Sequence, residues 1–172
     1  TGEVPQENLS VLRSTVYTLL VVAAAAVLIA TLWLPVLQIY GNSMSPTLIE
    51  GDILVSLKSD SFNTGDVVAF YYNNRILVKR LIAGPADWVD IDRDGNVYVN
   101  EELIEEPSCV EAFGICDLEL PYQVPANKFF VMGDHRSVAN DSRLSAIGCV
   151  ASDDIVGRLV FRVWPFSAFG VF

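Results

Sequence analysis

A long uncharged stretch near the N-terminus constrains this chain more than any other feature. Residues 14–49 are 36 consecutive positions without a charge, and within them Leu19–Leu37 is apolar apart from Thr31, with Pro35 near its end. Such a run is long enough to cross a hydrocarbon layer of ~30 Å as a helix. A secretory signal peptide has a shorter apolar core, of roughly 7 to 15 residues, with small residues after it. We therefore predict a transmembrane helix over residues 15–38 rather than a cleaved leader.

The basic residues around this stretch predict its orientation. Arg13 precedes the span, and no lysine or arginine follows it until Lys58. Because basic residues are retained on the cytoplasmic side, we expect a single-pass protein whose N-terminus lies in the cytoplasm. The chain then consists of a cytoplasmic segment, the transmembrane helix and an extracytoplasmic domain, with the bounds 1–14, 15–38 and 39–172.

The acidic balance of the chain excludes one large class of partner. The formal net charge is −10, from 21 acidic and 11 basic residues. Such a chain has little with which to neutralise a run of phosphates, so nucleic acid is not an expected partner.

Three cysteines and a single histidine bear on metals and redox chemistry. Cys109, Cys116 and Cys149 lack the paired spacing of a zinc site, and His135 does not complete one with them, so no metal is expected. Outside the cytoplasm, Cys109 and Cys116 could close a short loop as a disulfide, which would leave Cys149 free. The spacing is equally consistent with three free thiols.

From residue 51 onward the pattern is that of strands. Seven short segments are rich in β-branched and aromatic residues and are separated by Gly, Asn, Asp and Pro. Asn73-Asn74 and Asp94-Gly95 are signals of tight turns, because these residues tolerate positive φ. Long amphipathic helices are missing, so we predict a mainly β, antiparallel domain. The predicted strands are 53–57, 67–72, 75–83, 88–91, 97–99, 129–132 and 155–163.

A candidate nucleophile follows the predicted membrane exit, in residues 41–48 (GNSMSPTL). Gly41 and Pro46 would turn the backbone sharply and expose the hydroxyl of Ser43. A serine hydroxyl is a weak nucleophile unless a neighbouring base takes its proton. Taken alone, a serine in such a loop is more often a turn residue. The Gly-x-Ser-x-Gly elbow is excluded, because Ser45 stands at its second glycine position.

A candidate base lies in the predicted strand 75–83 (RILVKRLIA). Side chains alternate along a strand, so Lys79 shares its face with Leu77 and Leu81. Burial among apolar side chains lowers a lysine pKa from ~10.4 by several units, which would make the amine a usable base near neutral pH. The alternative is a lysine whose ammonium reaches water from an edge strand. The strand pattern alone does not decide between these interpretations.

A third segment combines acids and arginines in a predicted loop. It contains Gly133-Asp134-His135-Arg136, then Asp141-Ser142-Arg143, and Gly148 a few residues later. Such residues either form paired contacts that fix irregular backbone around a site or form a solvated turn. Spacing and composition are consistent with both.

Taken together and in this order, the three segments resemble the conserved boxes of bacterial type I signal peptidases. The matching boxes are Ser-Met-x-Pro-Thr-Leu at 43–48, Val-Lys-Arg at 78–80 and Gly-Asp-x-Arg with Asp-Ser-Arg and Gly at 133–148, and the resemblance extends to about residue 165. It implies a membrane-bound serine endopeptidase with a Ser/Lys dyad that cleaves signal peptides from secreted preproteins after small residues (Ala-x-Ala type), on the outer face of a bacterial cell membrane. Preprotein signal peptides, the lipid bilayer and possible contacts with the secretion machinery are the implied partners, and no cofactor is needed.

The resemblance also implies roles for individual residues. Ser43 would be the nucleophile, Lys79 its general base, and the Ser43 main-chain N–H an oxyanion donor. Ser43, Gly41 and Met44 would surround the oxyanion and substrate. The remaining matches are framework positions that shape the site: Asp134, Arg136, Ala139, Asp141, Ser142 and Arg143.

Three positions depart from the family pattern. Ala139 stands where a serine usually orients the catalytic lysine, so activity is reduced, or Ser137 or Ser142 replaces that serine, or the alanine was introduced. Gly41 stands where some members have a serine that completes the oxyanion hole. Residues 85–87 read Pro-Ala-Asp where Pro-Gly-Asp is common.

Other interpretations of single motifs are weaker. Residues 90–101 match a calcium-loop pattern, but a hairpin around Asp94-Gly95 explains the same residues, because the flanks resemble strands rather than helices. His135 could replace Lys79 as the base, as in the endoplasmic-reticulum and archaeal relatives. The aromatic C-terminal segment 163–172 is either a core-closing strand and tail or a surface that enters the lipid interface.

Two alternative functions also compete with the peptidase. One is a catalytically impaired, membrane-tethered module that binds secreted or pilus precursors. The alanine at position 139 favours this alternative. The other is a self-cleaving repressor with the same dyad, which would need a DNA-binding domain where this chain has a membrane span.

Overall fold

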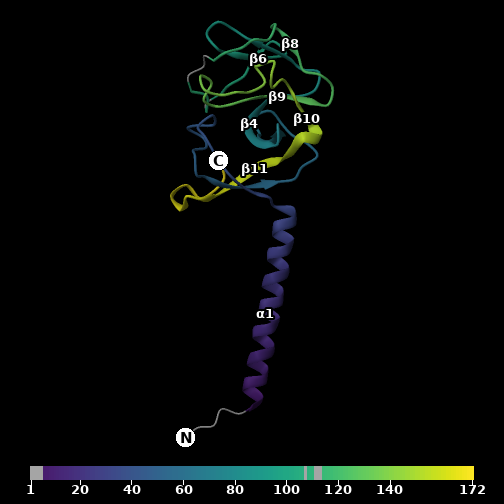
Figure 1. Ribbon diagram of the computed structural model, residues 1–172, viewed down its shortest axis with the longest axis vertical. Helices are drawn as coiled ribbons and strands as arrows, with labels where there is room; N and C mark the ends of the chain where they lie inside the picture. Colours follow the sequence, from purple (N-terminus) through teal and green to yellow (C-terminus); the bar gives the residue numbers. More distant parts are fainter. Residues whose placement is uncertain (1–5, 107, 111–113) are drawn as a thin grey trace. The chain divides into compact units, whose positions relative to one another are not determined.

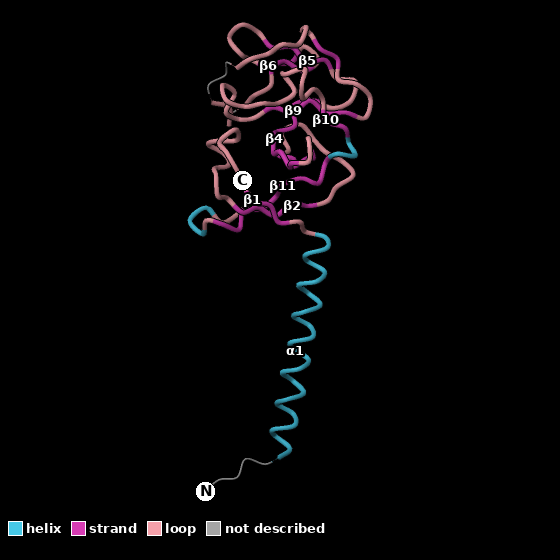
Figure 2. Tube along the Cα trace, viewed as in Figure 1, coloured by secondary structure: helices cyan, strands magenta, loops and turns pink. Residues whose placement is uncertain are grey.

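The computed structural model describes the backbone of residues 6–106, 108–110 and 114–172. It divides into two compact units, Thr1–Pro35 and Val36–Phe172. The first contains one helix and the second contains the strands (Figures 1 and 2).

The first unit is built around helix α1, Gln6–Trp33. Its segment Ser10–Ile29 is long and apolar enough to cross a membrane, since 20 residues at ~1.5 Å each span ~30 Å. The predicted transmembrane helix extended to residue 38, whereas α1 ends at Trp33 in the structure. Pro35 cannot donate the hydrogen bond that would continue the helix, and Val36–Gln38 forms strand β1.

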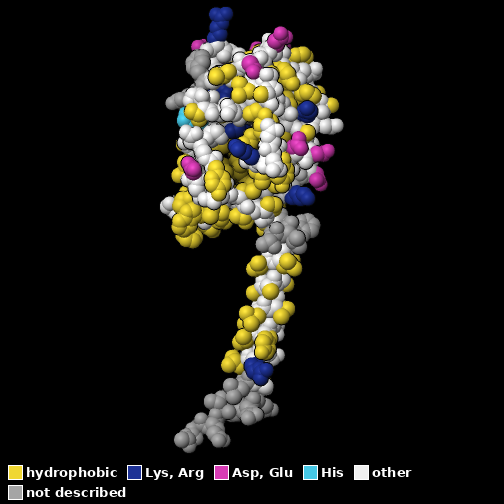
Figure 3. Space-filling model, in the orientation of Figure 1, with side chains coloured by type: hydrophobic (Ala, Val, Ile, Leu, Met, Phe, Trp, Pro, Cys, Tyr) yellow, Lys and Arg dark blue, Asp and Glu magenta, His cyan; other side chains and the backbone are white. Residues whose placement is uncertain are grey.

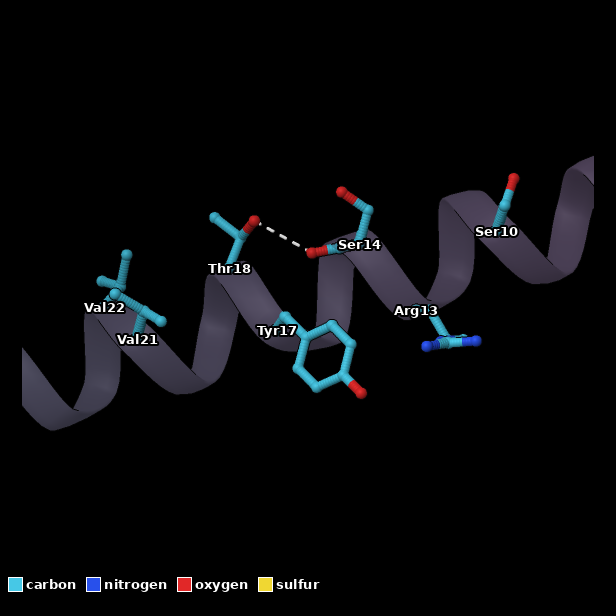
Figure 4. A pocket seen from close by; sticks show the side chains of 7 residues that line it. All are labelled: Ser10, Arg13, Ser14, Tyr17, Thr18, Val21 and Val22. Carbon is cyan, nitrogen blue, oxygen red and sulfur yellow. Dashed lines mark hydrogen bonds between the residues drawn. The ribbon is translucent and has the colours of Figure 1, made fainter.

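One side of α1 carries small hydroxyl side chains (Figure 4). Thr18 Oγ1 donates to the carbonyl of Ser14 at 2.9 Å, and Thr15 Oγ1 donates to that of Val11 at 2.9 Å. The hydroxyls of Thr15 and Thr18 are therefore satisfied by carbonyls of the same helix.

The second unit contains a seven-stranded and a four-stranded sheet. Strand pairs in both sheets are antiparallel, which confirms the predicted mainly β fold. The larger sheet has the order β1-β2-β11-β3-β4-β9-β10, with β2 at Ile53–Leu57, β3 at Val67–Tyr72, β4 at Arg75–Ala83, β9 at Lys128–Met132, β10 at Val150–Ala151 and β11 at Ile155–Trp164.

The smaller sheet lies at the end of this unit away from β1 and β2 (Figure 2). Its order is β7-β6-β5-β8, with β5 at Trp88–Ile91, β6 at Val97–Val99, β7 at Glu102–Leu103 and β8 at Tyr122–Gln123. Two short 3₁₀ turns, η1 at Ser152–Asp154 and η2 at Phe166–Ala168, complete the elements.

Both predicted tight turns form hairpins. Asn73 and Asn74 have φ of 45° and 62° and connect β3 to β4. Residues 92–96 connect β5 to β6, where Asp92 Oδ1 accepts hydrogen bonds from the N–H groups of Asp94 and Asn96. Strands rather than helices flank this turn, so the calcium-loop pattern belongs to a hairpin.

Three apolar clusters form the core and fix the strands that carry the candidate site. One joins the loop after β1 to the large sheet through Met44, Leu48 and Leu54. A second lies between the two sheets and includes Val89 and Phe130. These clusters therefore pack both the strands and the loop after β1 that carry the candidate site.

Candidate active site

Ser43 lies in a tight turn that connects β1 to β2. Gly41 enters this turn with φ of 81°, a backbone conformation that favours glycine. The Ser45 N–H donates to the Asn42 carbonyl at 3.0 Å, and the buried side chains of Met44 and Leu48 hold the turn against the core. Packing therefore fixes the backbone directly beside the Ser43 hydroxyl.

Lys79 reaches this hydroxyl from the middle of strand β4. Its side chain is buried, with 3% of the residue exposed, and its Nζ donates to Ser43 Oγ at 2.6 Å. Among the residues that the structure describes, this is the one hydrogen bond of that amine. The two side chains come from positions 36 residues apart in the sequence.

Burial changes the protonation of Lys79. Loss of solvation lowers the pKa of Lys79 from 10.5 to about 8; the carboxylates of Asp141 and Asp134 oppose this shift, and the charge of Arg143 adds to it. At pH 7 about a tenth of the amine is therefore uncharged. Its lone pair can then accept the proton of the neighbouring hydroxyl.

The segment after β9 packs directly on the Ser43 turn. The His135 N–H donates to the Ser43 carbonyl at 3.1 Å. A Cβ on Gly133 would lie 2.5 Å from that carbonyl, 2.5 Å from Ala139 Cβ and 3.5 Å from Lys79 Nζ. Only glycine fits this position, and Ala139 borders the space beside the lysine amine.

A polar network around Asp134 ties this segment to β4 and to the Ser43 turn. Asp134 accepts from Arg80 Nε at 2.8 Å, from Arg80 Nη2 at 2.6 Å and from Thr47 Oγ1 at 2.5 Å. The hydrogen bond to Asp134 raises the pKa of Arg80 above its usual range. Thr47 and Arg80 were not among the predicted framework residues, although both lie within the sequence boxes.

A second network is built around the fully buried Asp141. Its carboxylate accepts from Arg143 Nε at 2.8 Å, Arg143 Nη2 at 2.9 Å and the Gly133 N–H at 3.0 Å. Arg143 Nη2 also donates to the carbonyl of Arg136 at 2.8 Å. The pair is bidentate, so it fixes the orientation of the backbone around the candidate site.

The other predicted framework residues occupy the same buried region. Arg136 Nε donates to the Gly133 carbonyl at 2.9 Å, and its guanidinium pairs with Glu106, which the sequence did not suggest. Ser142 Oγ accepts the Val131 N–H at 3.0 Å. Ser142 therefore supports strand β9 and does not replace the serine expected near Lys79.

The candidate disulfide is not formed in the structure, where Cys109, Cys116 and Cys149 are free thiols. Burial raises the pKa of the thiols of Cys109 and Cys149. Both are therefore less reactive than an exposed cysteine.

Two hollows meet at the Ser43 and Lys79 side chains. The first, of about 680 Å³, lies between residues 36–41, with Met44, and the β4 residues 75–79. The second, of about 650 Å³, lies between β4 and the loops 72–73 and 138–147. Both hollows are therefore open to the Ser43 and Lys79 side chains.

Comparison with known proteins identifies the class. The family model for signal peptidase, peptidase S26, matches residues 12–164. The chain therefore belongs to the signal peptidase S26 family and is a serine endopeptidase of the type I signal peptidase class.

Particular relatives are spread over bacteria and plants. Signal peptidase IB of Staphylococcus aureus (strain COL) is 36% identical over 152 residues, which are 76% of this chain and 78% of that protein. The chloroplastic thylakoidal processing peptidase 1 of Arabidopsis thaliana is 34% identical over 145 residues, 74% of this chain and 41% of that protein. A signal peptidase I from Enterococcus faecalis V583, known from a crystal structure, has 26% sequence identity to this chain. The match covers 58% of this chain and 97% of that chain, with a TM-score of 0.49.

Proposed function

We propose that this chain is a membrane-bound endopeptidase that removes N-terminal signal peptides from secreted preproteins, with Ser43 as nucleophile and Lys79 as general base. The observation that carries the proposal is the 2.6 Å contact between Ser43 Oγ and the buried Lys79 amine. Membership of the signal peptidase family supports the reaction class.

The geometry supports a two-step acyl transfer. The neutral Lys79 amine takes the proton of Ser43 as its oxygen attacks the scissile carbonyl, and the resulting ammonium then protonates the leaving amine. A water molecule hydrolyses the acyl-enzyme, with Lys79 again taking and returning the proton. The buried surroundings of the amine allow both roles, because a pKa of about 8 lies close to the working pH.

The oxyanion would be stabilised mainly by backbone. The Ser43 N–H lies on the attacking residue itself and can donate to the developing negative charge. Gly41 offers no side-chain donor beside it. Each such donor typically contributes ~10²–10³ in turnover, so a single donor is consistent with an active but unoptimised site.

The larger hollow supports binding of an extended peptide. Strand β1 is an edge of the seven-stranded sheet, and β9 pairs with β4 only from Arg80 onward. Along residues 75–79, β4 therefore has a free edge on that side among the described residues. A substrate can add hydrogen bonds to these edges, and the apolar wall of Ile39, Met44 and Val78 suits apolar side chains next to the scissile bond.

We expect a preprotein with alanine at the first and third positions before the cleavage site to be cut at that site. Replacing the first of these alanines by phenylalanine should lower kcat/KM by at least ~10²-fold, because the resemblance to the signal peptidases implies that only small residues are accepted there. Mass spectrometry of the product N-terminus identifies the cleavage site, and the rate at which the product appears gives kcat/KM. Equal cleavage of both substrates, or cleavage at unrelated sites, would contradict the proposed specificity.

We further propose that α1 spans the membrane with residues 39–172 outside. The length of Ser10–Ile29 supports a span, and Arg13 supports the orientation. In the second unit the end of the chain exposes Trp164, Phe166 and Phe169, in the region that Figure 1 colours yellow and where apolar side chains gather in Figure 3. Such aromatic side chains suit a lipid interface.

Protease added to sealed, right-side-out vesicles should digest residues 39–172, and protection of that part would contradict this topology.

The Ala139→Ser variant should cleave faster than the parent chain, by about fivefold in kcat. A hydroxyl at this position would border the space beside Lys79 Nζ and could hold the amine toward Ser43, and one such hydrogen bond contributes ~1 kcal/mol. The same change at Ala151, on the distant strand β10, is the control and should leave kcat unaltered. If the parent chain is inactive and Ala139→Ser restores cleavage, the impaired binding module is favoured instead. If Ala139→Ser gives no gain, a hydroxyl at residue 139 does not position the lysine amine.

A further inference from the structure

A pocket on the smaller sheet has a chemistry unrelated to the dyad. It has a volume of about 490 Å³ and is lined by Trp88, Asp90, Tyr98, Glu101 and Pro121. None of these residues lines the two hollows beside the dyad. The lining combines two aromatic rings with two carboxylates, and no lysine or arginine is among its described residues. The pocket is therefore a separate site on the second unit.

The alternation of side chains along strands brings most of this lining to the exposed face of the sheet. The other face is packed, since Val89 and Val97 are fully buried in the core between the two sheets. Trp88 and Asp90 precede and follow Val89, so their side chains point away from that core. Tyr98 stands opposite Asp90 in the register of β5 and β6. Packing of the core therefore holds both rings and one carboxylate together, with Trp88 48% exposed.

The second carboxylate enters the pocket from a two-residue turn. Asn100 and Glu101 connect β6 to β7, and their φ values of 52° and 71° are both left-handed. Such a turn favours glycine at its second position, where a side chain is strained. Glu101 makes no ion pair and no side-chain hydrogen bond with any residue that the structure describes. Its carboxylate therefore stabilises no described part of the fold and is free to meet a ligand.

Carboxylates beside exposed aromatic rings favour an organic cation. Loss of solvation and the charge of Asp92 raise the pKa of Tyr98, and the charge of Asp90 adds to this effect, so a negative potential covers the ring. Trp is the aromatic side chain that attracts a cation most strongly. A metal ion fits less well, because the described residues include no group of three or more His, Cys, Asp or Glu that could hold one.

We propose that this pocket binds a lysine or arginine side chain of a partner polypeptide. The carboxylates of Asp90 and Glu101 accept its N–H groups, and the ring of Trp88 covers the charge. Leu103 stands opposite Tyr98 in the register of β6 and β7 and is 56% exposed, so it offers an apolar surface to the residues beside the basic one. A second copy of this chain, with its net charge of −10, is not a complementary partner. The proposal goes beyond the peptidase function and does not rest on it.

The test follows the indole NMR signal of Trp88 while a capped tripeptide with a central lysine is added to the full chain. The chain is kept at low salt in a detergent with a sugar headgroup, and matched tripeptides carry Gln or trimethyl-lysine instead. We expect the Lys peptide to bind about tenfold more tightly than the Gln peptide, since an exposed ion pair contributes up to about fivefold and a cation–π contact about twofold to fivefold. The trimethyl-lysine peptide should bind more weakly than the Lys peptide, because its ammonium donates no hydrogen bond.

Two adjacent glutamates supply matched variants. Glu101→Gln should weaken binding of the Lys peptide by about threefold to fivefold. Glu102→Gln makes the same charge change outside the pocket and should leave binding intact. Glu101→Gly should weaken binding as much as Glu101→Gln without lowering the unfolding temperature, because glycine fits the φ of 71°.

Four results would overturn the proposal. They are the absence of saturable binding of the Lys peptide, an equal loss of affinity in Glu101→Gln and Glu102→Gln, tighter binding of trimethyl-lysine than of lysine, and the same signal change with calcium alone. The third would assign the pocket to a choline-type headgroup, and the fourth would assign it to a metal ion. Cleavage of preproteins that depends on Ser43 would stand in each of these cases, so the two proposals fail separately.

Discussion

Ser43→Ala and Lys79→Ala should each lower preprotein cleavage by at least ~10³-fold. The first change removes the attacking oxygen, and the second removes the amine that lies 2.6 Å from it. Because the two groups act as a unit, the double variant should be no slower than the worse single variant. Single-turnover cleavage of a preprotein, followed by gel electrophoresis, measures the loss.

Two controls separate a loss of chemistry from a loss of fold. Lys58→Ala removes an exposed lysine that follows β2 and should cleave at the parental rate. Thermal unfolding should show that both dyad variants still fold cooperatively, since Ser43 is only partly buried and Lys79 becomes a smaller apolar residue. A folded Lys79→Ala variant that retains a tenth or more of the activity would show that another group removes the proton.

Asp141→Ala should destabilise the second unit by about 3–5 kcal/mol. The change leaves the buried guanidinium of Arg143 without its carboxylate and removes the acceptor of the Gly133 N–H. Removal of one partner of a buried ion pair typically costs this much, because an unpaired charge remains in a medium of low polarity. Chemical denaturation of the full chain in detergent, followed by fluorescence, measures the change.

A second variant identifies the reason for that loss. Asp141→Ala combined with Arg143→Met removes both charges, and should recover part of the stability. Arg158→Met breaks a more exposed ion pair with Asp66 and should cost no more than about 1 kcal/mol. A loss in Asp141→Ala as small as that in Arg158→Met would show that the Asp141 network does not hold the site together.

Much of the β domain was predictable from local signals. The strands 53–57, 67–72, 75–83, 88–91 and 97–99 have the predicted bounds, because each is rich in β-branched or aromatic residues and ends at a turn signal. Strands β7, β8 and β10 have two residues each, which is too short for a pattern. Strand β1 was assigned to the helix, because Val36–Gln38 continues the apolar run and only its pairing with β2 makes it a strand.

The candidate site was predicted less completely than the fold. The sequence boxes pointed to Ser43 and Lys79, and the structure places them in contact. The burial of Lys79 depends on β3, β9 and the loop after β9, so the strand pattern alone left it undecided. The partner of Arg136 is Glu106, thirty positions away and outside the boxes, and only tertiary structure brings the two together.

Arg80 illustrates a different reason for an incomplete prediction. It follows Lys79 and therefore faces the opposite side of β4, where no chemistry was expected. The structure shows that this side holds Asp134, which also accepts from Thr47 in the Ser43 turn. The strand thus presents the base on one face and, on the other, a residue that fixes the turn of the nucleophile.

The whole account depends on an uncharged lysine amine, and the pH dependence of kcat/KM tests this most directly. We expect kcat/KM to rise about tenfold between pH 6 and pH 7, to be half-maximal near pH 8 and to level off above it, because the neutral form of Lys79 accumulates through its pKa of about 8. A profile that is already level at about pH 7.5 would contradict the account, because a group other than the Lys79 amine would then remove the proton.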